Sequence, residues 1–102
     1  MAAAPSVGLV VRMTAKPETH DEVATFLTDA VDLANAESGT TVWFALRTDR
    51  STFRIVDAFP GDAERRAHLD GPIAAALREN ADRLLAAPPE ILPAHVLAAK
   101  VP

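Results

Sequence analysis

The segment that decides the fold is Thr52–Leu69, TFRIVDAFPGDAERRAHL. Its first part, residues 52–59, is rich in β-branched and aromatic residues and predicts a strand. Pro60-Gly61 ends that strand, and Asp62 is expected to cap a helix that continues as AERRAHL. A strand that turns at once into a helix is a building unit of an α+β fold.

Two further strands are predicted upstream. Residues 41–48, TVWFALRT, precede the turn residues 49–51, so they are expected to pair with residues 52–59 as an antiparallel hairpin. Residues 7–15, VGLVVRMTA, form the first strand of the chain, which Pro17 ends because proline cannot donate to a ladder. One face of this first strand is wholly apolar and the other begins apolar and turns polar, so both faces are expected to be at least partly covered.

A helix is predicted over residues 19–38. Thr19 and Glu22 have the spacing of a capping box, and Gly39 is expected to end the helix in a left-handed conformation. The apolar residues recur with the spacing of one buried stripe: Val23, Phe26, Leu27, Ala30, Val31 and Ala34. The helix is therefore expected to pack on the sheet.

The rest of the chain predicts a second helix and a last strand. Gly71-Pro72 interrupts the second helix, so we expect a kink or a restart at Pro72. Pro88-Pro89 ends this helix, and residues 94–101, AHVLAAKV, form the last strand. The order βαββαβ predicts a ferredoxin-like α+β fold, in which two helices cover one face of a four-stranded antiparallel sheet.

Composition limits the classes of function. The chain has 102 residues, a net charge of −4 and no cysteine, and we expect a single domain, residues 1–102, of which residues 1–6 are flexible. An acidic chain without a block of Lys and Arg does not suit a nucleic-acid partner. No apolar run reaches the ~20 residues of a membrane span and no signal peptide is recognised, so we expect a cytoplasmic protein with no membrane partner. An amino-acid composition rich in Ala and Arg and poor in Lys is typical of bacteria whose genomes have a high GC content.

Both faces of the predicted sheet carry apolar residues. Trp43 and Phe44 are consecutive residues of the predicted strand 41–48, so their two large rings point to opposite faces of the sheet. Two helices cover only one face, and a monomer would then expose a large apolar patch. We therefore expect a homodimer that packs sheet against sheet, through the sheet face and the last strand.

The strand 52–59 and the helix after it place a carboxylate beside an imidazole. Asp57 lies near the end of the strand with Phe59 on the same parity, and His68 lies about two turns into the helix. A nearby carboxylate raises the pKa of a histidine and orients its ring, so His68 and Asp57 are the candidate catalytic acid–base pair. The alternative is a structural histidine bonded to the backbone, with Asp57 in a surface ion pair.

Apolar residues supply the candidate substrate site. Trp43, the only tryptophan, offers a flat wall and one N–H donor, and it is assigned to substrate binding with Phe59, Val11 and Met13. Plain core or dimer packing is the alternative role for Trp43. The three histidines lack metal-ligand spacing, so no metal site is predicted. Neither a nucleophile elbow nor a phosphate-binding loop occurs in the sequence.

From residue 7 to residue 101 the chain resembles the antibiotic biosynthesis monooxygenase (ABM) domain family of the dimeric α+β barrel superfamily. The strongest likeness is RIVDAFPGDAERRAHL, in which Asp57, Phe59 and Ala67-His68 match the family's acidic-x-aromatic strand end and the helix that follows. In the second string, ESGTTVWFALRTDRSTFRI, Gly39 matches the glycine before the family's second strand.

This resemblance implies a homodimer in which each subunit holds a small apolar or aromatic ligand between sheet and helices. It implies a cofactor-independent monooxygenase that acts on a small quinol-like or anthrone-like aromatic. In such an enzyme His68 would remove or relay a proton and Asp57 would orient His68. Trp43 and Phe59 would wall the substrate ring.

Other branches of the family imply other functions. The haem-degrading branch uses Asn, Trp and His where this chain has Val11, His68 and Arg78 by register, so haem is set aside and no cofactor is expected. Two alternatives to the monooxygenase stay open. One is a non-catalytic dimeric protein, either stress-related or binding a small metabolite, and the other is a small-molecule isomerase.

Overall fold

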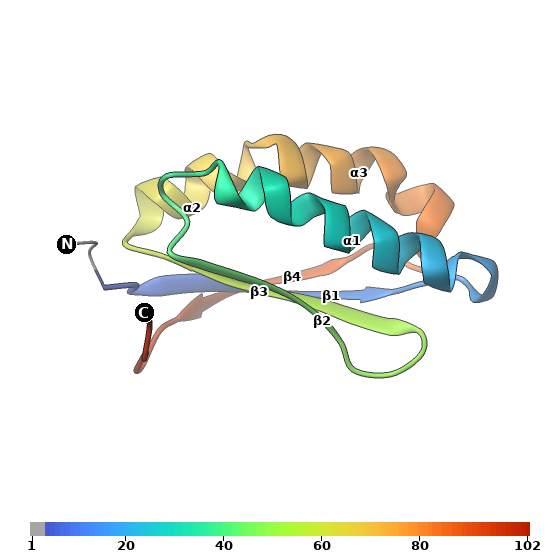
Figure 1. Cartoon of the computed structure of the whole chain (residues 1–102), viewed down its shortest axis with the longest axis horizontal. Helices are drawn as coiled ribbons and strands as arrows, with labels where there is room; N and C mark the ends of the chain where they lie inside the picture. The colour runs from blue at the N-terminus through green and yellow to red at the C-terminus, as the bar shows by residue number, and fades with distance from the viewer. Residues whose placement is uncertain (1–3) are drawn as a thin grey trace.

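The computed structural model of the chain describes residues 4–102 and is built on a four-stranded antiparallel sheet in the order β2-β3-β1-β4 (Figure 1). The strands are β1 (Val7–Thr14), β2 (Val42–Arg47), β3 (Thr52–Phe59) and β4 (Glu90–His95). One face is covered by the helices α1 (His20–Asn35), α2 (Asp62–Leu69) and α3 (Pro72–Leu84), and the short 3-10 helix η1 (Pro17–Thr19) precedes α1. This order, βαββααβ, confirms the predicted ferredoxin-like α+β fold.

The hydrophobic core lies between the sheet and the helices. The β1–β3 register pairs Met13 with Phe53 and Val11 with Ile55, which places these side chains on one face of the sheet. Helices and loops complete this core cluster with Ala15, Val23, Leu27, Leu77, Leu84 and Leu85. The predicted stripe of α1 is the face that packs on the sheet, except that Val31 is exposed.

The start of α1 differs from the prediction. The side chain of Thr19 makes no cap hydrogen bond, because its hydroxyl donates to the carbonyl of Leu84 at 2.6 Å. Glu22 pairs with Arg83 of α3. The predicted capping box is therefore wrong, since both of its side chains find partners that are distant in sequence and tie α1 to α3.

Two other predicted caps are also wrong. Helix α1 ends at Asn35, and no glycine in residues 4–102 has a positive φ, so Gly39 is not a left-handed cap. Gly61 is the N-cap of α2, and Asp62 lies in its first turn. The restart at Pro72 is confirmed, because α3 begins there. None of the helices described here is both long enough and apolar enough to cross a membrane.

The last strand lies earlier than the predicted residues 94–101. β4 pairs with β1 alone, so it is an edge strand, and proline is tolerated at a sheet edge because its missing N–H is not needed on the open side. Pro93 therefore sits inside β4 opposite Leu9, whereas the sequence argument began the strand after it. Leu97, which the prediction placed in the strand, is 98% exposed.

The two ends of the described chain lie at the same end of the sheet (Figure 1). The amide of Val96 donates to the carbonyl of Ser6 at 2.9 Å, and the amide of Ser6 donates to the carbonyl of Phe59 at 2.9 Å. Flexibility was expected for residues 1–6. Residues 1–3 lie outside the described residues, and Ser6 is held by these two hydrogen bonds.

The packing of α1 predicts unequal effects for two leucines of the same helix. Leu27 is 3% exposed and belongs to the core cluster, whereas Leu33 is 39% exposed. Leu27→Ala should lower the free energy of unfolding by roughly 2–5 kcal/mol, because it leaves a cavity, and Leu33→Ala by less than about 1 kcal/mol. Urea denaturation of both variants measures the difference, and equal losses would contradict the assigned face of α1.

Candidate functional site

Helix α2 buries one residue, and that residue is a histidine. His68 is 8% exposed, and its ring centroid lies 5.2 Å from that of the fully buried Phe59, with the planes tilted by 45°. Helix faces that pack on a sheet normally present apolar residues. A titratable ring at this position indicates a polar function or a polar structural role.

Each ring nitrogen of His68 faces a carboxylate. Nδ1 donates to Glu37 Oε1 at 2.6 Å, and Nε2 lies 3.1 Å from Asp57 Oδ2. The contact with Asp57 is an ion pair when His68 is protonated. We call Glu37, His68 and Asp57 the carboxylate–histidine array. It joins the loop after α1, helix α2 and strand β3.

The central strand β3 holds Asp57 inside the molecule. Its side chain is 0% exposed and faces the helices, since Asp57 pairs with Leu9 of β1 and with Trp43 of β2. Neither carboxylate oxygen of Asp57 has a hydrogen-bond partner, and neither does the buried Nε1 of Trp43. The alternative of a surface ion pair for Asp57 is therefore wrong. Burial of an acid beside His68 is the arrangement that an acid–base pair needs.

Sequence reasoning missed Glu37, because it placed this residue inside a helix over 19–38. The helix ends at Asn35, and Glu37 lies in the following loop, where its Oε1 also accepts a hydrogen bond from the Thr40 hydroxyl at 2.6 Å. A Cβ on Gly39 would stand 3.0 Å from Cγ of Glu64, so the loop lies tightly on α2. Gly39 indicates in the sequence that the backbone of this loop approaches another element closely, but it does not indicate that Glu37 reaches His68.

The array borders a pocket of about 290 Å³. This loop pocket is bounded by residues 36–40, by Glu64, Ala67 and His68 of α2, and by Gly71-Pro72. Glu37 and His68 line it, and Glu64 adds a second carboxylate, while none of its lining residues is Lys or Arg. The loop pocket is therefore suited to a ligand with hydrogen-bond donors and unsuited to an anion.

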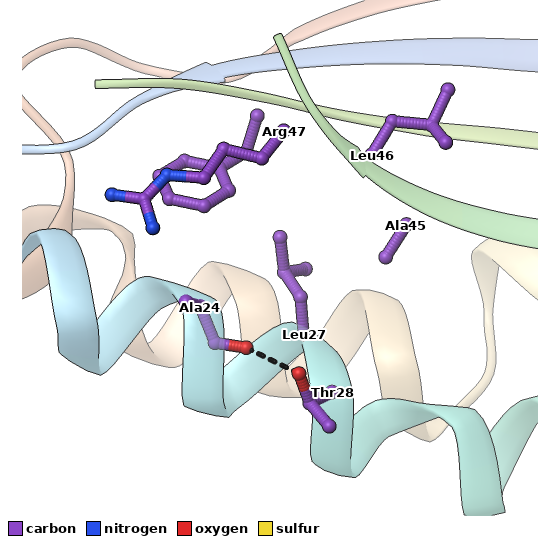
Figure 2. Close-up of a pocket in the computed structure, with 7 residues that line it drawn as sticks. Ala24, Leu27, Thr28, Ala45, Leu46 and Arg47 are labelled. Atoms are coloured by element: carbon purple, nitrogen blue, oxygen red, sulfur yellow. Dashed lines mark hydrogen bonds between the residues drawn. The ribbon is translucent and has the colours of Figure 1, made fainter. Parts of the chain in front are cut away.

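A second pocket lies between α1 and β2 (Figure 2). Hydrocarbon from Ala24, Leu27 and Ala45 lines it, and the guanidinium of Arg47 lies 4.9 Å from the ring centroid of Phe53. Its volume of about 110 Å³ is well below the roughly 300–1,000 Å³ of small-molecule sites. No member of the array lines this pocket, so the loop pocket is the better candidate.

The structure brings together four of the residues predicted for the site: His68, Asp57, Phe59 and Trp43. Val11 and Met13 lie instead in the core cluster, 7% and 1% exposed, and they do not line the loop pocket. Their assignment to substrate binding stays a prediction. Within residues 4–102, no group of three or more His, Asp or Glu side chains could hold a metal ion.

Electrostatics favour a protonated His68. Burial lowers the pKa of His68, but the contacts with Asp57 and Glu37 outweigh burial and hold this pKa above its ordinary value of 6.5. The imidazolium then lies between two carboxylates and compensates part of their charge. The array therefore holds the proton of His68 more tightly than water does and releases it as the pH rises through the raised pKa.

The raised pKa of His68 predicts a loss of stability as the pH rises. The folded state binds this proton more tightly than the unfolded state, so the contribution is complete below about pH 6.5 and is lost as the pH rises through the folded pKa. We expect the NMR titration midpoint of His68 to lie above 6.5 and the urea midpoint to fall from about pH 6 to about pH 9. Glu37→Gln should lower the NMR titration midpoint of His68 and make the urea midpoint depend less on pH. A midpoint of His68 below 6.5 in the wild type would contradict the array.

Comparison with known proteins places the fold. No family model and no curated protein matches the chain. NE2512, a protein of unknown function from Nitrosomonas europaea, is 51% identical in a match that covers 99% of this chain and 98% of that chain, with a TM-score of 0.95.

Two solved structures with lower identity show the fold alone. Rv0793 from Mycobacterium tuberculosis is 16% identical over 92% of this chain and 97% of its own, with a TM-score of 0.82. An antibiotic biosynthesis monooxygenase is 14% identical over 90% of this chain and 99% of its own, with a TM-score of 0.77. The chain therefore belongs to the same family as NE2512 and has the ferredoxin-like α+β fold of the antibiotic biosynthesis monooxygenases.

Proposed function

We propose that this protein is a cofactor-independent monooxygenase that acts on a small quinol-like aromatic. The observation that carries the proposal is the carboxylate–histidine array, an acid–base group that borders a pocket. The fold supports it, because it is shared with an antibiotic biosynthesis monooxygenase. The monooxygenase activity is named for that protein, and we extend it to this chain only as part of this proposal.

The proposed reaction begins with the loss of a hydroxyl proton from the substrate to the array. The enolate that remains is rich in electrons, and one of its ring carbons forms a C–O bond with O₂. The O–O bond then breaks, so that one oxygen stays on the carbon as a carbonyl and the other leaves as water with the hydrogens that the substrate has lost. The substrate supplies all the electrons that reduce O₂, so the balance requires no flavin, haem or metal.

Pocket size favours substrates with one ring. The loop pocket, at about 290 Å³, lies at the lower bound of the roughly 300–1,000 Å³ of small-molecule sites. A hydroquinone suits this volume better than a three-ring anthrone does. Phe59 packs beside His68 and Trp43 is the strand partner of Asp57, and in the proposed reaction their apolar surfaces keep water away from the array.

Oxygen consumption with a panel of hydroquinones and anthrones tests the proposed activity. We expect uptake above the spontaneous rate, faster with hydroquinones than with anthrones. His68→Ala should lower turnover by roughly 10²–10⁴, the usual size of an acid–base contribution. Uptake that survives this substitution would reject the role of His68, and absence of uptake across the panel would favour a non-catalytic binding protein.

The same array favours one further candidate, a small-molecule isomerase, because an isomerase that works through an enol also needs a buried acid–base group. Loss of deuterium from a labelled substrate without any uptake of O₂ would distinguish this candidate from the monooxygenase.

We also propose that the protein works as a homodimer that packs sheet against sheet. The face of the sheet opposite the helices carries a row of apolar side chains in register across all four strands, Leu92, Val10, Val56 and Phe44. Phe44 is 56% and Leu92 57% exposed. A row of exposed apolar side chains on one face of a sheet is typical of an interaction site. A second copy of the same face is self-complementary under a two-fold axis.

Light scattering tests the proposed dimer. The wild type should have the mass of two chains at micromolar concentration, and Phe44→Asp should have the mass of one, because it places a charge within the apolar row, at its β2 end. Val31→Asp is the control, since Val31 is an exposed apolar residue on α1, away from this face. A wild-type monomer, or dissociation by both variants alike, would argue against the proposed interface.

A further inference from the structure

One side-chain hydrogen bond joins the loop after α1 to α2. The loop ends at Thr41, whose amide donates to the carbonyl of Ala58 in β3 at 2.9 Å. Within residues 4–102, the hydrogen bonds made by residues 37–40 are local to the loop and the end of α1, except the bond at 2.6 Å between Glu37 Oε1 and His68 Nδ1. The attachment of this loop to α2 therefore depends on a donor that titrates.

The charged groups that face His68 are acidic. Glu37 faces Nδ1 from the loop, and Asp57 faces Nε2 from β3. Glu64 of α2, one helical turn before His68, lines the loop pocket with it. Arg65 of α2 is directed away, to a carboxylate of its own helix and to backbone carbonyls of β1 and β4. The residues of β1 and β2 that pair with Asp57 are uncharged. The charge of His68 is therefore what holds the two carboxylates on either side of it.

A neutral imidazole has one N–H, so it can donate to only one of these carboxylates, and its lone pair repels the other. Asp57 cannot turn away, because its side chain is fully buried on the central strand and neither oxygen has another donor. Glu37 can, because its side chain is 16% exposed and borders the loop pocket, and its Oε1 keeps the Thr40 hydroxyl as a donor. The proton of neutral His68 therefore belongs on Nε2, and Glu37 then faces a lone pair.

We propose that Glu37 is a latch that leaves Nδ1 when His68 loses its charge, so that residues 37–40 move away from α2 and Nδ1 becomes open to the loop pocket. In the closed state Nδ1 is occupied by Glu37 and cannot accept a proton from a ligand. In the open state Asp57 still orients the ring at Nε2, and Nδ1 is a free base. The latch does not depend on which ligand the pocket binds, so a failure of the proposed oxygenase would leave it unaffected.

The ¹⁵N NMR signals of the His68 ring test the latch in the wild type. At about one pH unit above the NMR titration midpoint of His68, most of the ring is neutral, and its proton should lie on Nε2, toward Asp57. A proton on Nδ1 would mean that Glu37 keeps its hydrogen bond in the neutral state, and it would overturn the latch. This measurement needs no variant to fold.

Chemical modification tests the opening of the loop. Diethyl pyrocarbonate adds a carbethoxy group to an accessible neutral imidazole nitrogen, and mass spectrometry of peptides gives the rate at each histidine. At one pH, about one unit above the wild-type midpoint of His68, we expect His68 to react at least about 10-fold more slowly in Glu37→Gln than in the wild type. The Gln amide can donate to Nδ1 and keep the loop closed. Titration alone predicts the opposite order, because Glu37→Gln leaves at least as much of the ring neutral.

Two controls separate the latch from a general effect of charge or reagent. Glu64→Gln removes a carboxylate of the same pocket lining that makes no ion pair with His68, so His68 should react as in the wild type. His95, which is exposed at the end of β4, should react at the same rate in all three proteins. A wild-type His68 that stays unreactive while His95 reacts, or equal rates for His68 in the wild type and Glu37→Gln, would overturn the latch.

Discussion

A buried imidazole between two carboxylates costs free energy of desolvation, and its three members are tolerated inside a protein only while each keeps its partner. Here the partners come from three separate parts of the chain, since Glu37 and His68 are 31 residues apart and Asp57 belongs to the central strand. The array therefore fixes the loop after α1 against α2 and fixes α2 against the sheet. The loop pocket exists because this contact holds its walls in place.

The core cluster and the carboxylate–histidine array lie toward different ends of the sheet. The core cluster gathers around Met13, Phe53 and Leu27, whereas α2 buries only His68 and α2 and β3 meet around Phe59. Apolar packing at one end can hold the fold while a polar array occupies the other. This separation explains why a small chain can keep charged groups buried at a site.

The sequence predicted most of the fold, because the signals that define it are local. The bounds of β3 and the restart at Pro72 follow from β-branched residues and from proline. The caps and the last strand were wrong for tertiary reasons, since Thr19 bonds Leu84 and since an edge position lets Pro93 sit within β4. His68 and Asp57 were found because the strand and helix that carry them are adjacent in sequence. Glu37 was missed because only the folded loop brings it to His68.

The sheet order also determines when the fold can be completed. The hairpin of β2 and β3 pairs neighbours in sequence, but β4 pairs only with β1, at the opposite end of the chain. Closing so long a loop is entropically costly and is recovered only when both strands are present. During synthesis, residues 7–84 can emerge and assemble their helices and three of the strands while one side of β1 still lacks its neighbour. A ribosome-bound chain of this kind exposes an unpaired edge at β1, where association with another nascent chain competes with the arrival of β4.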